Sequence, residues 1–252
     1  MKTLTQVVTT AVAAVLLFPA TMFAMGPRPV TYMSDGHAVH GLLYEPAGKG
    51  VHPAIVVVHE WWGLNAWVKE QAQELANEGY VALAVDLYGG KVTTNPAVAR
   101  QLDMGLDPKV ATANVVAAAK YLAAQKNVNA KRIGAVGWCM GGGYAALLAV
   151  HDPDLRAVAI NYGELPTSRA ELARIHAAVL GIFGGKDPVV TPQSVSAFEK
   201  TMHSLHKQIE VKTYADAGHA FENENDHPGY RAADARNAQA RMRAFFAREL
   251  KE

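Results

Sequence analysis

Short apolar segments alternate with amphipathic ones along most of this 252-residue chain, and this alternation limits the folds that it can adopt. Six segments are rich in apolar and β-branched residues: 54–58, 80–85, 133–136, 157–160, 178–183 and 209–214. Such segments suit strands that are buried on both faces of a parallel sheet. Helical patterns lie at residues 67–78, 108–125, 141–150, 192–205 and 230–250. The sequence therefore predicts an α/β fold, with helices on both faces of a mostly parallel sheet of seven or eight strands.

Local signals refine this expectation. Residues 30–33 and 39–44 flank the turn Ser34-Asp35-Gly36 and predict an N-terminal hairpin. Asp107 and Thr191 stand before prolines that begin two of the expected helices, so we expect both to be N-caps. Residues 89–107 are either a cap over the site or a long connection. No repeat or linker divides the sequence, and we expect one domain over residues 25–252.

The first 24 residues have the pattern of a secretory signal. Lys2 is their only charge, an apolar stretch covers residues 7–18, and the small residue Ala24 suits the end of the signal. The stretch is shorter than the roughly 20 residues that a membrane-spanning helix needs. We expect cleavage near Ala24 and an exported protein, periplasmic or secreted, without a membrane anchor.

The charge balance excludes one large class of partners. The chain has 24 Lys and Arg against 23 Asp and Glu, and no basic block. Removing residues 1–24 takes one lysine and no acid, which leaves 23 of each sign. We therefore expect no nucleic-acid partner. We expect a monomer that acts on a small molecule, with no metal and no cofactor.

The expected strand at 133–136 leads into Gly137-Trp138-Cys139-Met140-Gly141 and then into a helix. G-x-C-x-G between a buried strand and a helix is the pattern of a nucleophile elbow, with cysteine in place of serine. Glycines two residues before and after allow the strand and helix to approach closely at a strained turn. The turn also puts the Cys139 thiol at a helix N-terminus, which favours a thiolate. Cys139 is the only cysteine in the chain, so it forms no intrachain disulfide.

Two further candidates follow later strands. Asp187 comes after the expected strand at 178–183, and His219 comes after the one at 209–214. Nucleophile, acid and histidine in this order is the arrangement of the α/β-hydrolase triad. His219 would move the proton and Asp187 would orient the imidazole. Glu164, which follows the strand at 157–160, is an alternative for the acid.

The loop after the first buried strand reads His59-Glu60-Trp61-Trp62-Gly63. In α/β-hydrolases this loop supplies one oxyanion donor, and the residue after the nucleophile supplies the other. We therefore assign the oxyanion donors to the backbone N–H groups of Trp61 and Met140. Glu60 is either a helix N-cap or a group that tunes the pair Cys139–His219.

Taken together, five motifs resemble the dienelactone hydrolase family. They are His59-Glu60-Trp61-Trp62-Gly63, Asp86-Leu87-Tyr88, Gly137-Trp138-Cys139-Met140-Gly141-Gly142, Gly184-Gly185-Lys186-Asp187 and Gly218-His219-Ala220-Phe221. The resemblance covers about residues 30–250. It implies an α/β-hydrolase fold and hydrolysis of dienelactone to maleylacetate through a thioester on Cys139. It also implies that Glu60 keeps the resting thiol protonated, which favours its catalytic role.

The resemblance has departures around the substrate. The family's characterised members bind the substrate carboxylate through arginines near the Asp-Leu-Tyr segment and shortly after the catalytic histidine. Here Tyr88 is followed by Gly89-Gly90-Lys91, and Phe221 by Glu222-Asn223-Glu224. We expect the acids to repel a carboxylate. Trp62, Tyr88 and Phe221 are the expected substrate contacts.

Two functions stay open on the sequence. The first is a cysteine hydrolase of small esters or lactones, with another carboxylic ester or a thioester as a variant of its substrate. The second is a protein of the same fold without catalysis, which binds a ligand or senses oxidants through its thiol.

Overall fold

The computed structural model describes residues 26–225 and 229–252, so the expected signal segment lies outside the described residues. The strands are β1 (Arg28–Ser34), β2 (His37–Tyr44), β3 (His52–Val58), β4 (Val81–Asp86), β5 (Val128–Trp138), β6 (Ala157–Asn161), β7 (Ala178–Gly184) and β8 (Ile209–Tyr214). The helices are α1 (Ala66–Asn77), α2 (Pro96–Met104), α3 (Pro108–Ala123), α4 (Met140–His151), α5 (Arg169–Ala173), α6 (Pro192–Ser204) and α7 (Ala232–Lys251).

The strands form one eight-stranded sheet in the order β1-β2-β4-β3-β5-β6-β7-β8. The pairs β1–β2 and β2–β4 are antiparallel, and every other pair is parallel. The fold class is confirmed, and so is the hairpin, whose turn has positive φ at Asp35 and Gly36. In the register, Gly137 near the end of β5 pairs with Val58 and Ile160, the last or nearly last residues of their strands. The carboxyl ends of these strands therefore meet at one edge.

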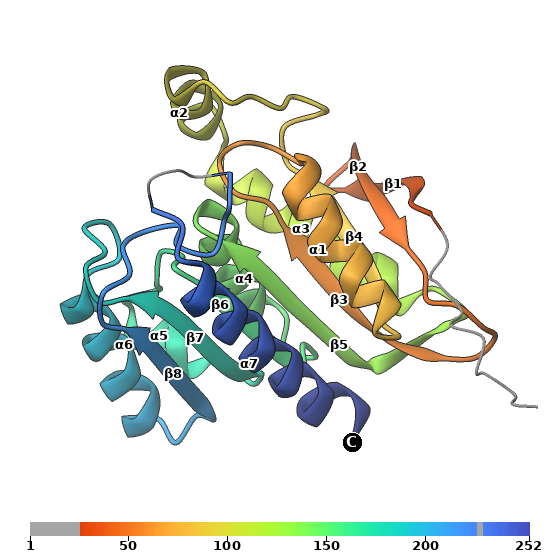
Figure 1. Ribbon diagram of the computed structural model, residues 1–252. Coiled ribbons are helices and arrows are strands. Elements are labelled where there is room, and N and C mark those ends of the chain that lie inside the picture. Colours follow the sequence, from red (N-terminus) through yellow and green to blue (C-terminus); the bar gives the residue numbers. More distant parts are fainter. Residues whose placement is uncertain (1–25, 226–228) are drawn as a thin grey trace, which may run out of the picture.

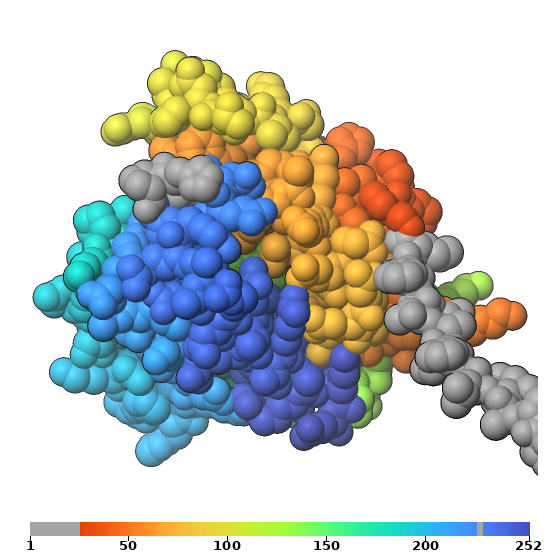
Figure 2. Space-filling view, in the orientation of Figure 1, coloured from red at the N-terminus to blue at the C-terminus, as the bar shows by residue number. Residues whose placement is uncertain are grey.

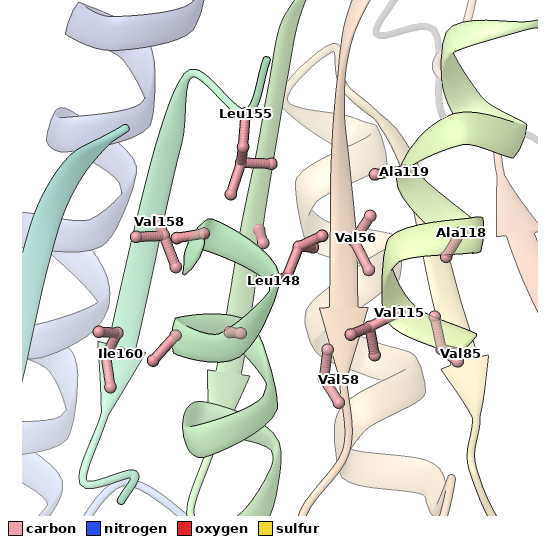
Figure 3. Packing of buried hydrophobic residues seen from close by; sticks show 14 of the residues in the cluster. Val56, Val58, Val85, Val115, Ala118, Ala119, Leu148, Leu155, Val158 and Ile160 are labelled. Carbon is pink, nitrogen blue, oxygen red and sulfur yellow. The ribbon is translucent and has the colours of Figure 1, made fainter. Parts of the chain in front are cut away.

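Helices cover both faces of the sheet (Figure 1). The buried side chains of α1 and α7 belong to one apolar core, and those of α3, α4 and α6 belong to the other. In the second core, Val115 of α3 and Leu148 of α4 lie beside Val56 and Val58 of β3, as the close view shows (Figure 3). Both faces of β3 are thus covered: its residues 54–58 have no exposed surface. This burial explains why the central strands are continuous apolar runs rather than alternating ones.

Two helices were not among those expected. α2 buries only Ala99, and α5 has five residues, so neither has a long apolar stripe. α2 instead begins at a local signal, because the side chain of Asn95 accepts hydrogen bonds from the N–H groups of Ala97 and Val98. The segment around α2 stands out from the body of the molecule (Figures 1 and 2). The expected caps Asp107 and Thr191 are confirmed.

No helix in the part of the chain that the structure describes is both long and apolar enough to cross a membrane.

Candidate active site

Cys139 stands between β5 and α4 in a conformation that side chains rarely adopt, with φ +53° and ψ −122°. The close packing around it requires glycine on both sides. A Cβ on Gly137 would lie 2.0 Å from the carbonyl oxygen of Gly141, and a Cβ on Gly141 would lie 2.3 Å from that of Val58. The strained turn lifts the thiol to the carboxyl edge of the sheet, as the nucleophile-elbow pattern predicts.

The structure brings the three expected triad residues together. His219 Nε2 lies 3.1 Å from Cys139 Sγ, and His219 Nδ1 lies 2.8 Å from Asp187 Oδ2. The loops after β5, β7 and β8 supply one residue each. The imidazole therefore links the thiol to a carboxylate, which is the geometry that activates a nucleophile.

Burial alone would lower the pKa of His219, but its hydrogen bonds and electrostatic interactions with Asp187 and Cys139 outweigh burial and raise this pKa to about 10. Burial raises the pKa of Asp187, yet its contact with His219 and with two backbone N–H groups brings that pKa below its usual value. These N–H groups, from Val189 and Val190, lie 2.7 and 3.0 Å from Oδ1. Asp187 is thus a fixed, ionised partner of His219, whereas the alternative acid Glu164 is exposed.

Glu60 is buried, with 1% of its surface exposed, in the loop after β3. The N-cap alternative is wrong, because Asn65 caps α1. One Glu60 oxygen accepts a hydrogen bond of 2.5 Å from the Asn223 side chain, and the other lies 3.5 Å from the donor hydroxyl of Tyr162. Donors to a buried carboxylate favour its ionised form.

Several supporting residues were missed by reasoning from the sequence. The Tyr162 ring packs edge-on against His219 at 5.3 Å between centroids. His59 joins two loops: its Nδ1 donates to the carbonyl of Glu60 at 2.6 Å, and its Nε2 accepts from the N–H of Leu87 at 3.1 Å. Burial lowers the pKa of His59, consistent with this neutral tautomer. Tyr162 has a φ of +38°, and no pattern in the sequence predicts this conformation.

The two expected oxyanion donors come from two different segments of the chain. Met140 is the first residue of α4, and N–H groups in a first turn have no acceptor within the helix. Trp61 lies in the loop after β3, and its ring packs against that of Trp62 at 4.8 Å between centroids. This loop is braced by the segment before α2, because the N–H of Thr93 donates to the carbonyl of Trp62 at 3.0 Å.

Comparison with known proteins identifies the family. The model of the dienelactone hydrolase family matches residues 39–250. The chain belongs to this family. A Salmonella typhimurium protein named "Putative carboxymethylenebutenolidase" is 33% identical over 214 residues, which cover 80% of this chain and 79% of the relative. A Bradyrhizobium protein named "Probable 2-oxo-3-(5-oxofuran-2-ylidene)propanoate lactonase" is 32% identical over 218 residues, covering 81% and 87%.

Solved structures agree with this assignment. A "Dienelactone Hydrolase-like Promiscuous" phosphotriesterase from metagenomic libraries superposes with a TM-score of 0.82 at 28% identity, covering 90% of this chain and 99% of that one. A Klebsiella pneumoniae structure named "Putative Dienelactone Hydrolase" gives a TM-score of 0.76 at 28% identity, covering 88% of this chain and 98% of that one. As a member of the dienelactone hydrolase family, this protein is a hydrolase of small esters or lactones.

The expected substrate contacts of this dienelactone hydrolase homologue divide into two groups. Tyr88 lies beside the nucleophile, and its hydroxyl lies 3.1 Å from Met140 Sδ. Trp62 is partly exposed in the neighbouring loop. Phe221, in contrast, has no exposed surface and packs between Tyr162 and Tyr214. Its expected role in substrate binding is therefore corrected to packing against these two tyrosine rings.

The acids expected to repel a carboxylate also need correction. Glu224 is exposed, but Glu222 is only 2% exposed, and burial raises its pKa to about 8, so at neutral pH its uncharged form predominates. Two other acids act on tyrosines in this part of the molecule. Burial and, to a lesser extent, the negative charge of Asp103 raise the pKa of Tyr88. Burial and the negative charges of Asp103 and Glu164 are among the causes that raise the pKa of Tyr144 to about 12. The negative charge of Asp103 therefore acts on both tyrosines of this dienelactone hydrolase homologue, and that of Glu164 acts on Tyr144.

Proposed function

We propose that this protein hydrolyses small esters or lactones with Cys139 as nucleophile, through a thioester acyl-enzyme. The observation that carries the proposal is the chain of contacts from Asp187 through His219 to the thiol, at 2.8 and 3.1 Å. A histidine that keeps its proton beside sulfur at neutral pH makes the thiolate available for attack.

In the first half of the reaction, the sulfur of Cys139 attacks the ester carbonyl carbon and a C–S bond forms. The carbonyl oxygen becomes an oxyanion, which the N–H groups of Met140 and Trp61 stabilise. The tetrahedral intermediate then expels the alkoxide as the C–O bond breaks. His219 Nε2 gives its proton to this leaving group. For a lactone, the leaving alcohol stays attached to the acyl group.

In the second half, His219 takes a proton from water, and the hydroxide attacks the thioester carbon. The C–S bond breaks, the acid leaves, and the sulfur is again paired with the protonated imidazole. Asp187 stabilises the imidazolium in both halves. Glu60, held by Asn223 and Tyr162, tunes the pair Cys139–His219 in this proposal.

For the substrate, we propose a neutral ester or lactone rather than one that carries a carboxylate. The positions where the family's arginines are expected hold Gly89-Gly90-Lys91 and Glu222-Asn223-Glu224. Lys91 is exposed and offers a point charge rather than the bidentate contacts of arginine. Asp103 and Glu164 add negative charge around Tyr144. These two acids would repel an anionic substrate.

The test is the initial rate on a panel of small esters, lactones including dienelactone, and thioesters, for the wild type and Cys139→Ala. We expect turnover that the variant loses without a change in its thermal unfolding. Mass spectrometry of the intact protein should show a trapped acyl group on the wild type alone, since Cys139 is the only cysteine. Full activity of the variant would refute the cysteine mechanism. Reversible oxidation of the thiol, with no turnover of any ester, would favour an oxidant sensor instead.

We also propose export, on the basis of the charge and apolar pattern of residues 1–24. Expression of the full chain in a bacterium, followed by fractionation and intact-mass measurement, tests this. A product in the periplasm or medium that lacks about the first 24 residues supports export, and an uncleaved cytoplasmic product refutes it.

A further inference from the structure

Glu222 is a buried acid that the proposed mechanism does not use. It lies three residues after His219, in a turn that hydrogen bonds close on both sides: the N–H of Asn223 donates to Ala220, and that of Arg231 donates to Phe221. This turn directs Glu222 inward, where 2% of its surface is exposed.

The surroundings of Glu222 offer it no hydrogen bond. Among the described residues, neither carboxyl oxygen has a partner, and the indole N–H of Trp138 is also unpaired. Trp138 directly precedes the nucleophile and is fully buried. Its indole lies near enough to favour the ionised form of Glu222, but without hydrogen-bonding geometry. Burying an unpaired charge is costly, so the neutral acid is the stable form here.

Within residues 26–225 and 229–252, the titratable groups with a resolved electrostatic interaction with Glu222 are Glu60 from the loop after β3 and Tyr214 at the end of β8. From α7, Arg241 and Asp234 act on Tyr214. Burial is the main reason why the pKa of Glu222 rises to about 8, and the negative charge of Glu60 raises it further. Such coupling is reciprocal: a charge on Glu222 would raise the proton affinity of Glu60 equally.

The carboxyl groups of Glu222 and Glu60 are also linked through Asn223, the residue after Glu222. Its side chain donates a hydrogen bond of 2.5 Å to Glu60. We propose that Glu222 is a positioning residue that acts through Glu60: it stays neutral at physiological pH, so that Glu60 alone carries the negative charge of the pair, and it reduces activity when it ionises in alkali. This inference rests on the proposed cysteine mechanism. A second buried charge would oppose the negative charge on the sulfur and on the oxyanion.

The test is the pH profile of kcat/KM for the wild type, Glu222→Gln and Glu224→Gln. The glutamine at position 222 keeps the shape of the neutral acid, and Glu224 is an exposed acid two residues away. At about pH 9 we expect the wild type and Glu224→Gln to lose roughly three- to tenfold more activity than Glu222→Gln, the effect of about half to one pKa unit. The same alkaline inflection in all three proteins would overturn the proposal.

Infrared spectroscopy gives a second readout, which does not depend on activity. A carboxylic acid C=O band should persist at neutral pH and disappear around pH 8, and Glu222→Gln should lack it. Absence of a wild-type carboxylic acid band near neutral pH would overturn the proposal even if Glu222→Gln failed to fold. Loss of the cysteine mechanism, by contrast, would show in Cys139→Ala and leave this band unchanged.

Discussion

The side chain of Asn223 donates a hydrogen bond of 2.5 Å to the carboxylate of Glu60 and so joins the loop after β8 to the loop after β3. The two residues are 163 positions apart in the sequence. Both are buried, at 1% exposure each. The amide group of Asn223 therefore links the loop that carries His219 to the loop that carries the proposed oxyanion donor Trp61.

Removing that amide should impair both stability and activity. Asn223→Ala leaves a buried carboxylate with one donor fewer, at a cost of about 1.5–3 kcal/mol, and we expect kcat/KM to fall roughly tenfold or more. Asn223→Asp should be worse than alanine, because it puts a second acid against Glu60. Denaturant unfolding and kinetics measure both effects. Asn225→Ala, at an exposed position two residues on, is the matched control. Wild-type activity of Asn223→Asp would contradict this role.

Asp187→Asn should keep the shape of the triad and lose its charge. We expect kcat to fall on the order of 10³-fold or more. Asp187 raises the pKa of His219, so in the wild type the imidazole stays protonated until the pH rises through about 10. In Asp187→Asn the imidazole should lose its proton at a lower pH. The rate of Cys139 alkylation as a function of pH measures this shift. Asp216→Asn, which removes an exposed ion pair with Lys186 on the next loop, should leave both quantities unchanged.

Two glycines of the elbow should respond in opposite ways to alanine. In Gly141→Ala the new Cβ would lie 2.3 Å from the carbonyl oxygen of Val58 and 2.5 Å from that of His59. Backbone atoms in a packed sheet cannot yield, and we expect a loss of at least about 3 kcal/mol together with activity. In Gly143→Ala the nearest atom is 3.5 Å away, and a helical alanine gains up to about 1 kcal/mol. Thermal unfolding of both variants measures the contrast; equal stability would contradict the close packing.

The negative charges of Asp103 and Glu164 should set the preference between neutral and anionic substrates. The double variant Asp103→Asn with Glu164→Gln removes two exposed acids whose charges act on Tyr144. We expect kcat/KM for an anionic ester to rise roughly three- to tenfold, and that for a neutral ester of the same size to stay constant. The gain should shrink in high salt, because exposed charges are screened. An equal change for both esters would show that the acids act on structure rather than on substrate charge.

Glu222 should also make stability depend on pH. The pKa of Glu222 rises from 4.5 in the unfolded chain to about 8 in the folded protein. Its contribution to the free energy of unfolding is therefore fully present below about pH 4.5 and is lost as the pH rises to about 8. Glu222→Gln should therefore gain stability relative to the wild type across this range, by a few kcal/mol at about 1.4 kcal/mol per pKa unit. Urea unfolding at several pH values measures the gain, and Glu224→Gln should show none. A constant difference would mean that Glu222 does not titrate there.

Local patterns were sufficient for most of the fold. The strands β3 to β7 are apolar runs because both of their faces are covered, and their predicted positions agree with the structure. The segment 209–214 also forms a strand, but the expectation that it is buried on both faces is wrong, because β8 is at the edge of the sheet and only its Tyr214 is buried. Asp107 and Thr191 were predictable as caps because capping depends on only a few neighbouring residues. α2 and α5 were missed because a helix that buries one residue, or has five, leaves little periodic signal.

The sequence by itself determined the α/β class, the strained turn at Cys139 and the order of the three triad candidates, because strand burial and glycine spacing are local properties. Tertiary structure alone decided the choice of Asp187 over Glu164, the hold of Asn223 on Glu60 and the inward position of Glu222. These depend on which loops meet at the edge of the sheet and on how deeply each side chain is buried there. Charge and pKa follow from that burial, so residues of one chemical type acquire different roles within one loop: Glu222 is buried and neutral, and Glu224 is exposed.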